Sequence, residues 1–174
     1  WDLGVGDSTA IWFCQRSGPE WRAIDYLEAS GVGLDHYVRE INARPYVYGE
    51  HIWPHDGKNR EFATGLERTQ VAANMGLHVR VLDQHQLMAG IDATRRALHM
   101  IWMDADKCQR GIDALSLYRR DWDEKRQDFK TNPLHDWTSH GADAMRYMIM
   151  GDPRSASQRS DWSKPIQPKV GTIA

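Results

Sequence analysis

Residues 9–29, TAIWFCQRSGPEWRAIDYLEA, contain the strongest fold signal in this chain. The two ends of this stretch are rich in β-branched and aromatic residues, which favour strands. Between them, residues 17–20 (SGPE) are typical turn residues. Residues 1–4 (WDLG) have the pattern of a strand's end, and residues 4–8 (GVGDS) that of a turn. We therefore predict three antiparallel strands over residues 1–29.

The rest of the chain alternates helical and strand patterns. Apolar residues at helical spacing from Leu34 to Ile41 predict a helix that ends near Pro45, and the next strand is expected over 46–53. A strand, a helix and a strand within this length are typical of parallel pairing through a crossover. The fold class is α/β, with a mixed central sheet of three antiparallel strands plus parallel strands, flanked by helices. Further helices are predicted at 67–75, 87–103, 107–118 and 136–150, a strand at 78–82, an alternative short strand at 99–102, and a charged loop or exposed hairpin at 119–131.

Length and composition indicate one compact domain. The chain has 174 residues and a formal net charge of −2, which excludes a uniformly basic nucleic-acid coat but not a local basic rim. Residues 1–150 form the predicted domain, and residues 151–174, with three prolines and four serines, form a predicted C-terminal tail. The two cysteines match no disulfide framework, and no apolar run is long enough to span a bilayer. The opening at Trp1 suggests a domain cut from a longer chain, or a processed one.

Three aspartates stand where structure alone does not require them. Asp2 lies in strand-like sequence, Asp56 follows a strand, and Asp143 lies within a helix among small and apolar residues. On that helix a polar column repeats at i, i+4, i+7 and i+11, and small neighbours permit close packing. The column consists of Asp136, His140, Asp143 and Tyr147.

Each aspartate also has a plainer interpretation. Asp56 precedes a glycine and is compatible with an ordinary turn. Asp143 is three residues before Arg146, so the two can form a solvated ion pair. Asp2 is compatible with an exposed position at the end of the chain.

Three carboxylates gathered at one point suit Mg²⁺ or Mn²⁺, which prefer oxygen ligands. Two such ions can activate a water and stabilise the leaving oxygen of a phosphodiester. Zinc is disfavoured because the chain has no closely spaced Cys/His cluster. The doublets at 55–56 and 135–136 (HD) also occur in His-Asp phosphohydrolases, but that family is all-helical whereas the first doublet here follows a strand.

The order of these aspartates and the short sequence motifs around them show a family resemblance over residues 1–150. The sequence resembles the C-terminal nuclease domain of the large terminase subunit of tailed bacteriophages, which has an RNase H-like (RuvC-like) fold. The matching motifs are DLG at 2–4 with DSTA at 7–10, WPHD at 53–56, PLHDW at 133–137 and SHGADAMRY at 139–147.

The resemblance implies a two-metal-ion DNA endonuclease that cuts concatemeric double-stranded viral DNA during genome packaging. Asp2, Asp56 and Asp143 would be its metal-binding triad for two Mg²⁺ or Mn²⁺ ions, and His140 would contact the site as a further catalytic residue. Asp7 also occurs in the first motif of the family. We nevertheless prefer to interpret Asp7 as a turn residue whose side chain caps its own backbone. For Asp136 we prefer the role of helix N-cap.

Basic residues near the site are candidates for DNA phosphate contacts. Residues 107–130 carry seven Lys/Arg against five Asp/Glu, a net charge of +2, and would touch DNA or the motor unless they form a solvated loop. The predicted DNA-binding residues are Lys58, Arg60, Arg68, Lys125 and Arg126.

The resemblance also implies partners. They are double-stranded DNA, the portal protein, the small terminase subunit and an N-terminal ATPase domain of the same full-length chain, since no GxxxxGK[ST] loop occurs here. The expected place of action is the host bacterial cytoplasm, at the procapsid portal, with no membrane contact. Two alternatives stay open: a RuvC-like junction resolvase, and a non-cleaving DNA-grip or portal-docking module of the motor.

Overall fold

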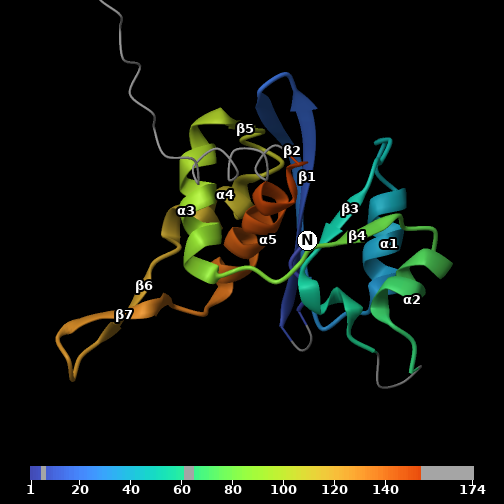
Figure 1. Ribbon diagram of the computed structural model, residues 1–174. Helices are drawn as coiled ribbons and strands as arrows, with labels where there is room; N and C mark the ends of the chain where they lie inside the picture. The colour runs from blue at the N-terminus through green and yellow to red at the C-terminus, as the bar shows by residue number, and fades with distance from the viewer. Residues whose placement is uncertain (5–6, 61–64, 154–174) are drawn as a thin grey trace, which may run out of the picture.

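The computed structural model describes residues 1–4, 7–60 and 65–153 (Figure 1). Most of the predicted tail, residues 154–174, and part of the predicted turn at 4–8 lie outside the described residues. Among the helices that the structure describes, none is long and apolar enough to cross a membrane.

The predicted antiparallel strands form the centre of the molecule. Strand β1 (Ser8–Ser17) pairs with β2 (Glu20–Ser30) in a continuous antiparallel register that is interrupted by one irregularity between Phe13 and Cys14. The third predicted strand is reduced to an isolated antiparallel bridge between Asp2 and Ala10 of β1. In this bridge the backbone N–H of Asp2 donates to the carbonyl of Ala10 at 2.8 Å. Strand β5 (Ile101–Met103) pairs parallel with the opposite edge of β2, at residues 21–23.

A second, parallel pair consists of β3 (His51–Trp53) and β4 (Val79–Val81). The amino group of Trp1 donates to the carbonyl of Ile52 at 3.1 Å, so the first residues of the chain lie between β1 and β3. The strand predicted over 46–53 is too long, because residues 46–50 form no strand. Their tyrosine hydroxyls instead reach neighbouring elements, as when Tyr48 donates to the carbonyl of Ile41 at 2.8 Å.

The parallel pairing predicted between the strands before and after the first helix is wrong. After β2 the chain passes through α1 (Leu34–Asn42) to β3, but β3 pairs with β4, and the parallel partner of β2 is β5. The helical pattern at 87–103 ends earlier than expected, and the alternative short strand near its end is confirmed as β5. The hairpin predicted at 119–131 is confirmed as β6 (Arg120–Asp123) and β7 (Asp128–Pro133). The other helical elements are η1 (His55–Lys58), α2 (Arg68–Asn74), α3 (Leu87–Ala97), η2 (Leu98–Met100), α4 (Gln109–Leu117) and α5 (Trp137–Gly151).

Successive residues of β1 and β2 point to opposite faces and feed two apolar clusters. One cluster joins β1 to α1 and β3 through Ile11, Ile41 and Trp53. The other joins β1 and β2 to α5 through residues that include Trp12 and Met145. Figure 1 shows the result: α3, α4 and α5 lie on one side of the long β1–β2 ribbon, and α1 and α2 lie on the other.

Helix α5 approaches the ribbon closely because it presents backbone there. The indole N–H of Trp12 donates to the carbonyl of Gly141 at 2.8 Å. A Cβ at Gly141 would lie 2.9 Å from both the Tyr26 hydroxyl and the Cβ of Ala114. On α4, a Cβ at Gly111 would lie 2.5 Å from the Trp12 ring. These two glycines therefore set the spacing between the helices and the ribbon.

We predict that Gly111→Ala destabilises the chain by about 1–3 kcal/mol, because the added methyl group overpacks the Trp12 contact. Alanine is the better helix former by roughly 1 kcal/mol, so packing must outweigh propensity for this result. Chemical denaturation of both proteins measures the difference. The control is Ser116→Ala on the exposed side of the same helix, which should change stability by less than about 0.5 kcal/mol. A Gly111→Ala protein more stable than the wild type would contradict the described packing.

Candidate active site

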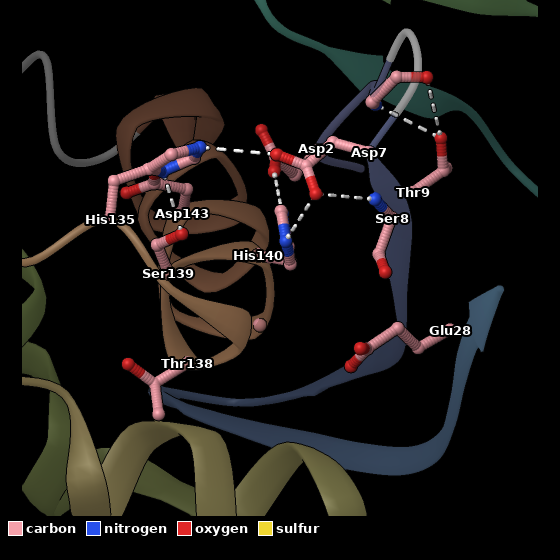
Figure 2. A network of polar contacts seen from close by, with 12 residues as sticks. Asp2, Asp7, Ser8, Thr9, Glu28, His135, Thr138, Ser139, His140 and Asp143 are labelled. Carbon is pink, nitrogen blue, oxygen red and sulfur yellow. Dashed lines mark hydrogen bonds and ion pairs between the residues drawn. The ribbon is translucent and has the colours of Figure 1, made fainter. Parts of the chain in front are cut away.

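His140 occupies the centre of a polar cluster between α5 and the start of β1. Its ring is 6% exposed, with Nδ1 3.6 Å from Oδ2 of Asp2 and Nε2 3.2 Å from Oδ1 of Asp7 (Figure 2). Contact with Asp2 raises the pKa of His140, burial opposes the rise, and the charge of Asp7 adds to it. The imidazole thus links two carboxylates that come from the two ends of the loop before β1.

Asp7 extends this cluster to a second histidine. Its Oδ1 accepts from the backbone N–H of Ser8 at 3.2 Å, as expected of a turn residue, while its Oδ2 lies 3.1 Å from Nε2 of His135. Burial would raise the pKa of Asp7, but His140, Ser8 and His135 together lower it. The role of His135 was not predicted. It lies in the matching stretch at 133–137, but the sequence alone did not bring it to Asp7. Ser139, one turn later, contacts its Nδ1 at 3.0 Å.

Asp143 lies one turn after His140 on α5 and is half-buried. Oδ1 of Asp143 lies 3.0 Å from Nη2 of Arg146, so the ion pair considered from the sequence is present. It is not solvated, because the Arg146 side chain is only 7% exposed. Burial raises the pKa of Asp143, Arg146 opposes this, and the charge of Asp2 raises it further.

Asp56 lies in the short helix η1, directly after β3. Its Oδ1 is buried and finds no hydrogen-bond partner within the part of the chain that the structure describes. A buried acceptor without a donor is costly, at roughly 1–3 kcal/mol. The plain turn interpretation explains the backbone of Asp56 but not this unsatisfied carboxylate oxygen.

The predicted triad is not drawn together into a closed ligand group. Over residues 1–4, 7–60 and 65–153, no three His, Cys, Asp or Glu side chains are arranged so that they could hold a metal ion. Asp2 turns toward His140 and Asp143 toward Arg146, whereas the Trp1–Ile52 hydrogen bond brings the start of the chain to the strand that leads to Asp56. The donor chemistry nevertheless fits a hard divalent cation, since all three residues supply carboxylate oxygens and that of Asp56 lacks a donor.

Asp136 is confirmed as the N-cap of α5, because its side chain accepts from the backbone N–H of Thr138 at 2.9 Å. The basic residues predicted to bind DNA fall into two separate groups. Lys58, Arg60 and Arg68 lie in and after η1, and Lys125 and Arg126 lie in the turn of the β6–β7 hairpin. In Figure 1 the hairpin and α2 project on opposite sides of α5.

The two carboxylates beside His140 predict an elevated pKa for this histidine. In the metal-free chain, His140 should titrate above its ordinary pKa of 6.5, and Asp7→Asn should lower that pKa, because it removes a negative charge from Nε2. Because the pKa of His140 is higher in the folded state, protonated His140 stabilises the fold. This stabilisation is fully present at pH values below about 6.5 and is lost as the pH rises through the folded-state pKa. NMR of the histidine ring resonances against pH measures the shift. Asp35→Asn, at an exposed position of α1, is the control. A His140 pKa in the Asp7→Asn protein that equals the value in the Asp35→Asn protein would contradict the described contact.

No protein-family model matches this chain, and no curated protein sequence matches it. Solved structures do match. The large terminase of a thermophilic bacteriophage, in complex with ADP, superposes with a TM-score of 0.64 at 19% identity, over 87% of this chain and 38% of that one. A second crystal form of the same terminase gives a TM-score of 0.62 at 20% identity, over 85% and 37%.

The g2p (large terminase) nuclease domain of bacteriophage SPP1, solved with bound Mn, matches over 84% of this chain and 80% of that domain. Its TM-score is 0.62 and its identity 14%. The present chain thus spans less than two fifths of the thermophilic phage's terminase but corresponds to most of the SPP1 domain. These matches confirm the expected fold class: the chain has the RNase H-like α/β fold of large-terminase nuclease domains.

Proposed function

We propose that this chain is the nuclease domain of a phage large terminase and cuts concatemeric double-stranded DNA during genome packaging. The observation that carries the proposal is the position of His140 on α5 between the carboxylates of Asp2 and Asp7, with Asp143 one turn further along the same helix. The similar SPP1 nuclease domain was solved with bound Mn, which supports the use of a divalent cation.

In this proposal Asp2, Asp56 and Asp143 hold two Mg²⁺ or Mn²⁺ ions. When bound, the ions supply an activated water and neutralise the departing 3′ oxygen of the phosphodiester. The buried oxygen of Asp56 is available as a ligand because no donor within the described residues engages it. A cation must compete with the nearly buried Arg146 for the carboxylate of Asp143.

His140 has a positioning role and a candidate catalytic role at the same site. Its Nδ1 faces Asp2, so the ring orients the carboxylate that comes from the start of the chain. Its Nε2 faces Asp7, which anchors the ring from the opposite side. Ring and carboxylates are therefore arranged before DNA arrives, which lowers the cost of ordering the site.

The wider setting is also a proposal. The terminase of the thermophilic phage was solved with ADP and with ATP-gamma-S, and this chain covers 37–38% of it. We infer that the full-length protein carries an N-terminal ATPase domain and works with the portal protein and the small terminase subunit, at the procapsid in the host cytoplasm. Cutting through phosphate contacts rather than base contacts suits an enzyme that must cleave many sequences.

Plasmid cleavage tests the proposal. The wild-type chain should convert supercoiled plasmid to nicked or linear DNA in Mg²⁺ or Mn²⁺ and not in EDTA. Asp2→Asn, Asp56→Asn and Asp143→Asn should each reduce the rate by at least roughly a hundredfold, because each removes a ligand charge, and loss of even a supporting group around a metal typically costs about 10–100-fold.

The matched control is Asp92→Asn, an exposed acid-to-amide change on α3, which should cut like the wild type. Duplex binding in EDTA should survive all of these changes. Cleavage that persists in the three site variants would show a contaminating nuclease. Folded wild-type chain that fails to cut in either metal would contradict the proposed activity.

A further inference from the structure

A pocket of about 520 Å³ opens at the edge of β2, next to the acidic cluster. Strand β5 covers only residues 21–23 of that edge, so in the described chain residues 26–30 have no strand partner there. The first residues of α4 lie across this uncovered edge. The polar residues that line the pocket are Ser8, Tyr26, Glu28, Ser30, Lys107 and Arg110.

The strand register ties this pocket to the candidate active site. Asp2 is paired with Ala10, and Ala10 with Glu28, so the three residues form one row across neighbouring strands. At about 4.8 Å per strand, the backbones of Asp2 and Glu28 lie roughly 10 Å apart. Paired residues place their side chains on the same face of the sheet, so the methyl group of Ala10 lies in the row between the side chains of Asp2 and Glu28. Figure 2 shows Glu28 and Ser8 on the ribbon that faces His140.

Arg110 is held in place at the rim of this pocket. Its guanidinium stacks on Trp137 with Cζ 3.9 Å from the ring centroid, and Nη2 lies 3.3 Å from Oε1 of Glu28. The Glu28 carboxylate, only 10% exposed, also accepts from the Tyr26 hydroxyl at 2.7 Å. Arg110 itself is 52% exposed, so a fixed planar cation presents N–H groups to solvent. Lys107, three residues earlier in the turn before α4, adds a second, exposed cation, whose Nζ donates to the Tyr46 hydroxyl at 3.4 Å.

We propose that this pocket binds a backbone phosphate of the DNA strand through Arg110 and Lys107, a few nucleotides from the phosphodiester at the acidic cluster. The identification of the ligand as DNA rests on the proposed function. A planar guanidinium suits a phosphate because it can donate two parallel hydrogen bonds, and the serine hydroxyls add further donors. At a rise of about 3.4 Å per nucleotide, about 10 Å corresponds to roughly three nucleotides.

The charge pattern explains why such a contact is needed. Asp2, Asp7, Asp143 and Glu28 repel a polyanion wherever cations do not compensate them. Arg110 and Lys107 supply positive charge immediately beside this cluster, whereas the β6–β7 turn projects away from the body of the molecule in Figure 1. The pocket therefore offers the DNA strand a positive anchor beside the point of cleavage.

Fluorescence anisotropy with a labelled duplex, in EDTA to prevent cutting, tests this site. Arg110→Ala and Lys107→Ala should each weaken binding about 3–10-fold at low salt and reduce the slope of log K against log [salt] by about 0.9, the value for one lost phosphate contact. Arg110→Lys should bind more weakly than the wild type, because it keeps the charge but loses the planar fork. Arg39→Ala, 68% exposed on α1, is the matched control and should bind like the wild type.

The outcomes separate this site from the proposed nuclease. Arg110→Ala and Lys107→Ala proteins that bind like Arg39→Ala would overturn the pocket and leave the nuclease proposal intact. Weakened binding by both variants, with a wild type that never cuts, would support the pocket and refute the nuclease. Inorganic phosphate that displaces the duplex better than NaCl of equal ionic strength would identify a free-anion site instead. Because Lys107 is on the surface, its variant keeps the test valid if Arg110→Ala unfolds.

Discussion

The arrangement of the site depends on how closely α5 lies against the β1–β2 ribbon. At Gly141 the helix presents backbone, which accepts a hydrogen bond from Trp12 and leaves no room for a side chain beside Tyr26. His140 precedes this glycine, and Asp143 follows two residues later, so the same contact brings this part of α5 to Asp2 and the start of β1. A larger spacing would move His140 away from the carboxylates of Asp2 and Asp7.

Charge compensation is the second principle of the site. Without cations, the protein balances its carboxylates internally: Asp2 and Asp7 through His140, Asp143 through Arg146, and Glu28 through Arg110. Asp56 is the exception, with a buried oxygen that no donor among the described residues satisfies. Bound cations would therefore compete with these internal partners for Asp2 and Asp143 but meet no competitor at that oxygen of Asp56. In the proposed metal site, a cation would therefore bind this oxygen of Asp56 without displacing an internal partner.

Much of the fold was readable from local pattern, because β-branched runs, turn residues and helical spacing act over a few positions. The antiparallel strands, α1, the charged hairpin and the Asp136 cap are confirmed. Pairing between distant strands was not readable: β3 pairs with β4 and β5 with β2, a choice that tertiary packing makes. The candidate site also has features that the local sequence predicted and features that only tertiary packing determines. Sequence order singled out Asp2, Asp56 and Asp143, and the family resemblance added His140. The His135–Asp7 and Glu28–Arg110 contacts depend instead on how α5 and α4 pack against the β1–β2 ribbon.

The central claim is that Asp2, Asp56 and Asp143 share one divalent-cation site. Anomalous X-ray diffraction from crystals of the chain grown with Mn²⁺ tests it most directly. The account predicts anomalous peaks within about 2–2.6 Å of carboxylate oxygens from all three residues, with Asp143 turned away from Arg146. Manganese bound only elsewhere, with Asp143 still paired to Arg146 and the Asp56 oxygen still without a partner, would contradict it.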